Sequence, residues 1–527
     1  MRPILAFHVA APAVPAPVDT ELRSPTRLAD RSSRIDRRLR PLVQALAVLA
    51  LVAPPARAQE RRAGEPDRFL AECRQAAEER HEGVSRLSDQ CIPLAEIPKR
   101  PRPLIELGEP FLGTGTLHRG IKLPGGAVWQ PAFLAFGTIR AAVQGGRLNS
   151  GTPSEIDRGE AVGRVDLFGN LYLTQTERIL IGLRPLDQDG RFTGYYFADP
   201  PLDSLGNEDK SLTEFNAVVR TLFFEGDIGE IFPNLDNDDS SFWDIYFSVG
   251  RQPLDFGDGL LLNDDALDMV GLTRANMKIG SIGNTRVTGV FAWSQINRQG
   301  AGRNVRDDSA SLFGLFTEMD FRSTTFQLDA AYVMSGETTG DGLHVGIGDI
   351  RRWGRANNIF RVLASFPIGG ETEFNSSGVL IHDQFSWTPK GNHNLWYVGA
   401  FAGIDRFRSA TRGPSSGGPL GQTGILFAAP GIGRVGGALG SFADNAVGGA
   451  LGHQLFFGAT RQQVVFEVGG RMNTDPDVTG GDFAAFGGRF QAAMGRRTVI
   501  VIDGVSAYNF EASAVNLVGR LELQIQM

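Results

Sequence analysis

Apolar and polar residues alternate along most of the chain with a period of two, which indicates β-strands. The clearest case is the last stretch, 515–527, where apolar residues and one glycine occupy the odd positions and polar residues the even positions, except Val518. A strand with this pattern has one apolar face and one wet face. The stretch is longer than a usual soluble strand and fits a tilted membrane-spanning strand of about 9–11 residues with overhang.

The same alternation recurs from residue 106 onward. The most regular segments are 161–173, 243–249, 286–294, 313–321, 326–332, 360–366 and 486–494. Further candidates lie near 129–144, 177–186, 215–225, 266–278, 377–388, 394–404, 453–460, 462–471 and 497–509. These roughly 17 segments predict an all-β fold, a transmembrane antiparallel β-barrel of about 16 or 18 strands, because bacterial barrels have an even number.

The chain before this region carries the features of an export signal. A basic run at 34–40 is followed by an apolar stretch at 41–55 and then by Ala56-Arg57-Ala58. This order is typical of a signal peptide cleaved after Ala58, and a short buried helix is the alternative. We therefore predict a leader and signal peptide at 1–58, a short periplasmic helical extension with a Pro-rich linker at 59–105, and the barrel at 106–527.

The extension contains the only two cysteines of the chain, Cys73 and Cys91. In an oxidising periplasm two such thiols usually pair, so we expect a disulfide outside the barrel. Two free thiols are the alternative. In the chain-entropy model a bridge closing so short a loop would stabilise the extension by roughly 3 kcal/mol.

Composition and motifs exclude several classes of function. The net charge of −7 disfavours nucleic acid as a partner, because phosphate binding requires a basic face. There is no P-loop, zinc motif or nucleophile elbow, and His382, His393 and His453 have no serine at a recognisable catalytic spacing. We therefore predict no enzymatic activity and no cofactor.

One partial metal motif occurs in an acidic run. Asp236, Asp238 and Ser240 have the one-three-five spacing of a calcium loop, but the required glycine and the closing glutamate are missing. A weak calcium site is one interpretation, and a solvated acidic loop is the other.

The polar row of the strands should face a water-filled lumen, since a charge against lipid costs about 2–4 kcal/mol at the bilayer midplane. The predicted pore-lining residues are Arg164, Asp166, Asp244, Arg286, Glu318, Asp320, Asp329, Arg361, Arg489, Arg520 and Glu522. Their signs are mixed, which predicts weak charge selectivity. The alternative is that these charges pair across neighbouring strands.

Two further expectations concern the loops. The segment 409–448 is rich in Gly, Ala and Ser but contains Ile425-Leu426-Phe427, so it is either an inward-folded constriction loop or an external loop. Arg251 is in an odd-numbered position, like the lipid-facing apolar residues of the segment 243–249 that precedes it. We therefore predict that it lies near the rim, and not at mid-membrane, and that it pairs with Asp255 or Asp258.

The stretch SVGRQPLDFGDGLLLNDD at 248–265 resembles a strand–loop segment of outer-membrane barrels of the alginate-export and related porin-like type. The resemblance implies a channel in the bacterial outer membrane, with outer-membrane lipid and small hydrophilic solutes or saccharides as partners. Alginate exporters are strongly basic inside, whereas this predicted lining is mixed. An exopolysaccharide export pore and a non-channel adhesin or scaffold stay open as alternatives, as does a homo-oligomer.

Overall fold

The computed structural model describes residues 102–108, 120–174, 176–188, 190–199, 210–213, 215–234, 243–300, 304–336, 339–428, 431–433, 435–458, 460–475 and 481–527. The predicted signal peptide, nearly all of the predicted extension, both cysteines and the calcium candidates Asp236, Asp238 and Ser240 lie outside these ranges. Within them, no helix is long and apolar enough to cross a membrane.

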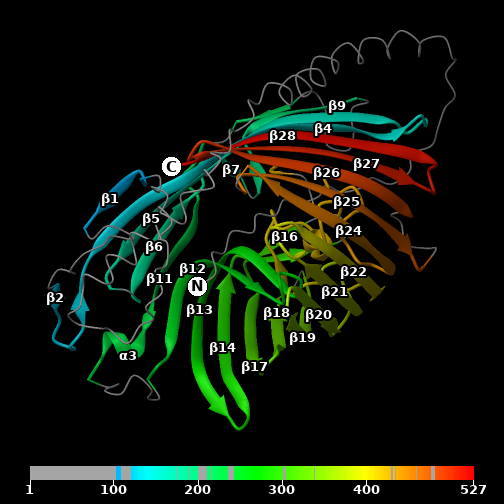
Figure 1. Ribbon diagram of the computed structural model, residues 1–527. Helices are drawn as coiled ribbons and strands as arrows, with labels where there is room; N and C mark the ends of the chain where they lie inside the picture. Colours follow the sequence, from blue (N-terminus) through cyan, green and yellow to red (C-terminus); the bar gives the residue numbers. More distant parts are fainter. Residues whose placement is uncertain are drawn as a thin grey trace, which may run out of the picture. The chain divides into compact units, whose positions relative to one another are not determined.

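Eighteen antiparallel strands form a closed barrel, which confirms the predicted fold class (Figure 1). Closure is made by the last strand pairing with the first, with Leu521 opposite Val143. The barrel strands are β4 (Ala132–Ser150), β5 (Ile156–Tyr172), β6 (Arg178–Leu183), β11 (Val219–Asp227), β12 (Tyr246–Phe256), β13 (Leu262–Ile279), β14 (Ile282–Ser294), β17 (Ser311–Asp320), β18 (Thr324–Met334), β19 (Asp341–Trp353), β20 (Ala356–Ile368), β21 (Gly378–Trp387), β22 (Leu395–Asp405), β24 (Ala446–Phe457), β25 (Gln462–Asn473), β26 (Phe483–Met494), β27 (Thr498–Asn509) and β28 (Ala514–Gln526).

Short elements accompany the barrel. Four short strands extend its sheet: β1 (Ile105–Leu107), β9 (Gly194–Asp199), β10 (Lys210–Leu212) and β23 (Thr411–Arg412). Three two-stranded hairpins lie apart from it, made by β2 (Ile121–Lys122) with β3 (Val128–Trp129), β7 (Asp187–Gln188) with β8 (Arg191–Phe192), and β15 (Ile296–Gln299) with β16 (Asn304–Asp307). Within the described ranges two single turns are helical, α3 (Ile228–Ile231) and η3 (Pro419–Gln422).

The two rims of the barrel differ in the length of their connections. One rim, here called the short-turn rim, carries the tight turns 280–281, 321–323, 354–355, 388–394 and 495–497, with the α3 connection as a longer exception. The opposite long-loop rim carries 184–218, 295–310, 369–377 and 406–445. In bacterial outer-membrane barrels the short turns face the periplasm.

The outer surface of the barrel is apolar because one row of each strand's alternation points outward. Large apolar side chains on these rows are exposed, among them Leu272, Phe313, Leu315, Ile347, Phe360, Val468, Phe486 and Leu517. Their neighbours along each strand point inward, as the register of the pairs requires. A soluble barrel would not leave so continuous an apolar surface uncovered.

Aromatic rings gather on the outer surface near the short-turn rim. Trp387 stacks on Trp396 with centroids 5.8 Å apart, and Trp396 stacks on His453 at 3.9 Å. Such rings suit the interface between hydrocarbon and water. Asp383, which interrupts the apolar row of the same strand, accepts a hydrogen bond of 2.6 Å from the Asn358 side chain.

Several strands are longer than the predicted segments, and three departures bear on the predicted site or on the strand count. β19 was not predicted, and it completes the count of 18. β12 begins at Tyr246, so the predicted pore residue Asp244 precedes the strand. β24 begins at Ala446, inside the segment expected to be a loop, because its first half is Gly- and Ala-rich and shows little alternation.

Candidate functional site

The candidate site is the barrel interior, where the predicted charges are mostly paired. A chain of alternating charges crosses four neighbouring strands on the inner wall. Arg489 donates to Asp503 at 2.7 Å, and Arg520 joins Asp503 to Glu522, both at 2.6 Å. Arg140 donates to the other oxygen of Glu522, also at 2.6 Å. The register that brings these residues together runs from β26 through β27 and β28 to β4.

A second buried network holds the predicted pair Arg164 and Asp166, whose side chains lie 2.7 Å apart. Arg184 donates to Asp166 at 2.8 Å and to Asp265 of β13 at 2.8 Å. Its third carboxylate, Asp187, lies 3.3 Å away. Arg220 of β11 also pairs with Asp187, at 2.8 Å, so six charged groups are tied together across β5, the end of β6, β7, β11 and β13.

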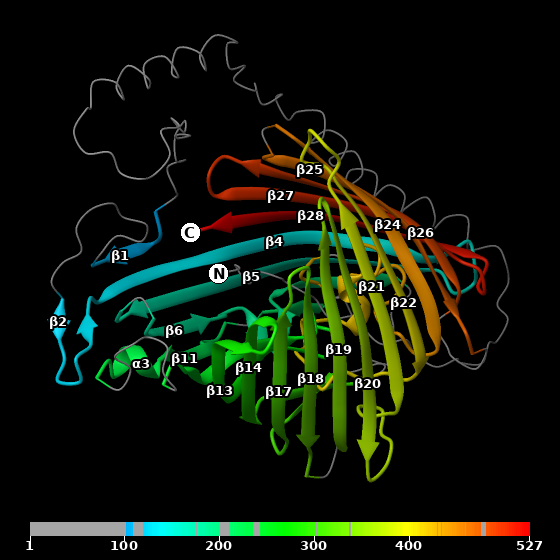
Figure 2. The same cartoon turned by 60° about the horizontal axis from the view of Figure 1, so that its bottom comes forward.

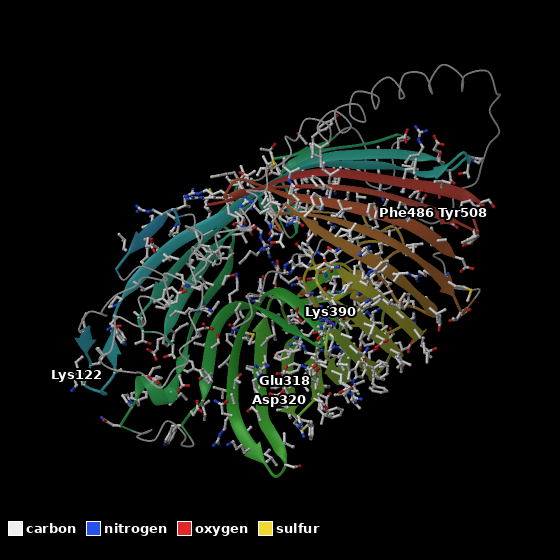
Figure 3. The ribbon with its side chains drawn as sticks, in the orientation of Figure 1. Lys122, Glu318, Asp320, Lys390, Phe486 and Tyr508 are labelled. Atoms are coloured by element: carbon white, nitrogen blue, oxygen red, sulfur yellow. The ribbon has the colours of Figure 1, made fainter. Side chains whose placement is uncertain are left out.

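Two further predicted residues, Glu318 and Asp320, lie on β17 toward the short-turn rim (Figure 3). Arg286 pairs with Glu318, directly opposite it in the register. Asp320 ends β17 and accepts a hydrogen bond of 2.7 Å from Thr325. The side chain of Asp329 on β18 is buried and points into the barrel, since Asp329 lies opposite the inward-facing Phe316 of β17.

Arg251 does not pair as predicted. It makes two hydrogen bonds to Asp268, at 2.7 and 2.8 Å, because β12 and β13 place these residues directly opposite each other. Asp258 bonds instead to Arg361, at 2.9 Å, and Asp255 is not the partner. Asp268 lies opposite Ser294, the last residue of β14, so the Arg251–Asp268 pair lies near the long-loop rim. A position near a rim was predicted for Arg251.

Loops from the long-loop rim fold into the lumen, which the yellow coil inside the ring of strands shows (Figures 1 and 2). We call 407–445 the inner segment. Its residues Leu420, Leu426 and Phe427 are fully buried and belong to one apolar cluster with Leu261 from the β12–β13 hairpin and Leu312 from the wall. The inward-folded interpretation of this segment therefore holds in the structure.

The inner segment also bonds to the wall. Glu467 of β25 accepts from the backbone N–H groups of Ile425 at 3.0 Å and Leu426 at 2.8 Å. Five strands further along the barrel, Glu160 of β5 accepts from the N–H of Val435 at 3.2 Å. Two wall carboxylates thus hold the middle of the segment, and its first strand β23 (Thr411–Arg412) pairs with β13, halfway around the barrel from β25, so the segment spans the interior.

Arg412 fixes the entry of the inner segment. Its strand β23 pairs in parallel with β13, Leu262 opposite Thr411. Burial lowers the pKa of Arg412 to about 10, although Asp255 and Asp264 act in the opposite direction, so the guanidinium stays charged at neutral pH. It donates to three carbonyl oxygens of its own segment, at 2.7 to 3.2 Å.

An uncharged polar surface covers the inner wall in the half nearest the short-turn rim. Its glutamines come from five strands between β21 and β28: Gln384, Gln454, Gln463, Gln491 and Gln524. Gln454 donates to Gln463 at 2.5 Å, and Gln463 donates to Gln491 at 2.7 Å. We call this set the amide arc, and the predicted pore-lining set missed it because that set contained only the charged members of the polar rows.

Two of the three histidines considered for catalysis, His382 and His453, contact other side chains of the described residues. The ring of His382 lies 3.0 Å from the Thr423 hydroxyl of the inner segment and is buried. His453 lies on the outer face against Trp396. These two rings are therefore on opposite faces of the wall.

No family model matches the sequence, and no curated protein matches it. Among solved structures, the chain is similar to OccK5 (OpdH) of Pseudomonas aeruginosa, with 11% identity, 75% of this chain and 98% of that chain covered, and a TM-score of 0.47. A BenF-like porin of Pseudomonas fluorescens Pf-5 gives 12% identity, 75% and 98% coverage, and a TM-score of 0.49. The fold assignment rests on the strand pairing described above.

Proposed function

We propose that the chain is a bacterial outer-membrane channel for the passive passage of small hydrophilic solutes or saccharides, with weak charge selectivity. The continuous apolar outer surface supports placement in a bilayer, since a barrel satisfies all its backbone hydrogen bonds internally. The short turns would then face the periplasm and the long loops the exterior.

The observation that carries the proposal is the neutral character of the inner wall. Its charges compensate one another in chains such as Arg489–Asp503–Arg520–Glu522, and the amide arc carries none. Without a fixed field of one sign, neither cations nor anions are strongly favoured. Amide groups donate and accept hydrogen bonds, which suits them to solute hydroxyls.

The inner segment limits the size of the solute. An 18-stranded barrel leaves an aqueous channel unless it is filled, and the buried apolar cluster around Leu261, Leu426 and Phe427 fills part of this lumen. That obstruction argues against the export of a polysaccharide chain, which requires a wide continuous passage.

We expect the refolded full-length chain to form channels in planar bilayers with a cation-to-anion permeability ratio near unity. The double variant Gln463→Glu, Gln491→Glu should shift this ratio toward cations, because it adds two carboxylates of one sign to the amide arc. Reversal potentials in a salt gradient measure the shift.

Ser281→Glu is the matched control, since it adds a carboxylate to an exposed turn at the same rim but outside the interior. It should leave the ratio close to that of the unmodified chain. Strong selectivity in the unmodified chain, or equal ratios in the double variant and the control, would contradict the proposal.

A further inference from the structure

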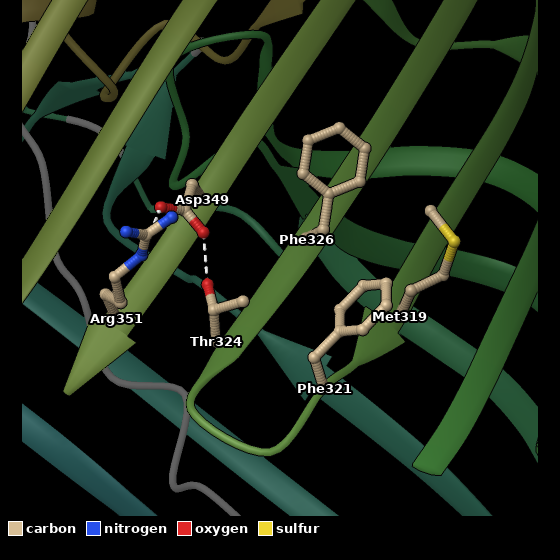
Figure 4. A pocket seen from close by; sticks show the side chains of 6 residues that line it. All are labelled: Met319, Phe321, Thr324, Phe326, Asp349 and Arg351. Atoms are coloured by element: carbon tan, nitrogen blue, oxygen red, sulfur yellow. Dashed lines mark hydrogen bonds and ion pairs between the residues drawn. The ribbon is translucent and has the colours of Figure 1, made fainter. Parts of the chain in front are cut away.

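An open pocket of about 600 Å³ lies on the outer face of β17, β18 and β19, next to the short-turn rim (Figure 4). Its apolar lining is Met319, Phe321 and Phe326. The register places Met319 opposite Phe326. Both share the outward row of exposed residues such as Leu328, so the pocket faces the membrane and not the lumen.

Polar groups form the other side of this pocket. Arg351 pairs with Asp349 at 2.9 Å, through its Nε atom. The Thr324 hydroxyl hydrogen-bonds to the same carboxylate and lies 3.1 Å from the carbonyl oxygen of Ile350. An ion pair on an outward row is costly against hydrocarbon but suits the level of lipid headgroups. The carboxylate and hydroxyl therefore hold a half-exposed guanidinium at the edge of an apolar hollow.

The pocket belongs to a longer basic surface. The tight turns from β13 to β27 and the strand ends beside them expose seven further cations, Lys278, Arg322, Arg352, Arg355, Lys390, Arg496 and Arg497. The tight turns 280–281, 321–323, 354–355, 388–394 and 495–497 contain no acidic residue. The long-loop rim of the same strands, by contrast, bears Asp308, Glu371, Glu373, Asp405, Asp444, Asp475, Asp482 and Glu511.

We propose that this pocket binds one anionic phospholipid of the periplasmic leaflet. The lipid phosphate lies against Arg351 and the neighbouring exposed Arg322, and an acyl chain runs over Phe321, Phe326 and Met319. Clusters of basic residues at a membrane surface recognise anionic headgroups, and the apolar hollow beside them accepts hydrocarbon. A soluble anion would use the guanidinium groups but not the outward aromatic surface. The proposal rests on the membrane placement proposed above.

The test is native mass spectrometry of the detergent-solubilised, refolded full-length chain titrated with phosphatidylglycerol, with phosphatidylcholine of the same acyl chains, and with inorganic phosphate. The unmodified chain should retain one phosphatidylglycerol more tightly than phosphatidylcholine. The triple variant Arg322→Gln, Asp349→Asn, Arg351→Gln lowers the local charge by one unit and should weaken phosphatidylglycerol retention by about five-fold. Removing Asp349 as well avoids leaving an unpaired carboxylate.

The matched control is Glu371→Gln with Arg406→Gln, an exposed pair on the long-loop rim whose side chains lie 2.6 Å apart, and it should leave lipid retention unchanged. Three results would overturn the proposal. The unmodified chain could retain both lipids equally, or the triple variant could retain phosphatidylglycerol as tightly as the unmodified chain does. Inorganic phosphate could also displace phosphatidylglycerol when the two are present at the same concentration. The conductance of the same preparations in planar bilayers distinguishes a failure of the lipid site from a failure of the proposed channel function. The triple variant should conduct like the unmodified chain whether or not it retains the lipid. If it does not fold, Arg322→Gln alone should still weaken retention.

Discussion

Replacing residues 414–442 with a short Gly-Ser linker is expected to raise the single-channel conductance several-fold while leaving the barrel closed. The segment crosses the lumen and contributes Leu420, Leu426 and Phe427 to the apolar cluster inside it. The wall strands pair with one another without its help, apart from the two-residue contact of β23 with β13. Emptying an 18-stranded barrel leaves a water-filled passage. Planar-bilayer recordings measure the change, and heat-modifiable migration on gels shows whether the barrel is folded.

The milder variant Glu467→Gln tests the same idea without a deletion. The amide cannot accept the backbone bonds of Ile425 and Leu426 with the strength of a carboxylate, so the segment should leave the wall more often. We expect more frequent transitions to a higher conductance level. Unchanged conductance in a folded deletion variant would show that solutes do not pass where the inner segment lies, and silence in both variants would favour the adhesin or scaffold interpretation.

Much of the barrel could be predicted because alternation with a period of two is written directly in the sequence. β19 was missed because its inward row is Gly342, His344, Gly346 and Gly348, which gives no polar row to recognise. The glycines have a packing reason. A Cβ on Gly348 would lie 2.7 Å from a guanidinium nitrogen of Arg361, and one on Gly346 would lie 2.7 Å from a methyl group of Leu363.

The charged members of the interior could also be found from the sequence, but their partners could not. Pairing depends on register, and a shift by one residue exchanges the two faces of a strand. Asp503 lies on a strand whose alternation is poor, so its place between Arg489 and Arg520 was invisible. Asp258 reaches Arg361 only because a loop folds inward, and strand periodicity says nothing about the path of a loop.

The chain of charges from β26 to β4 predicts that removing the acid Asp503 lowers the free energy of unfolding more than removing the base Arg520 does. Asp503→Asn should destabilise the barrel by about 3–5 kcal/mol, the usual cost of breaking a buried ion pair by removing one partner. Both Arg489 and Arg520 lose a carboxylate in that variant, and Glu522 alone is left to compensate Arg520. Arg520→Met should cost less, because Arg489–Asp503 and Arg140–Glu522 survive as two separate pairs.

The free energy of unfolding from urea titration in lipid vesicles measures both effects, and the double variant Asp503→Asn, Arg520→Met isolates the coupling between them. The matched control is Asp308→Asn, which breaks a pair with Arg306 whose side chains are 54% and 44% exposed. Exposed pairs contribute about 0–1 kcal/mol, so this variant should remain near the unmodified chain. If neither Asp503→Asn nor Arg520→Met cost more than this control, the wall charges would be acting as independently hydrated groups, and the neutral lining from which we infer weak selectivity would lose its structural basis.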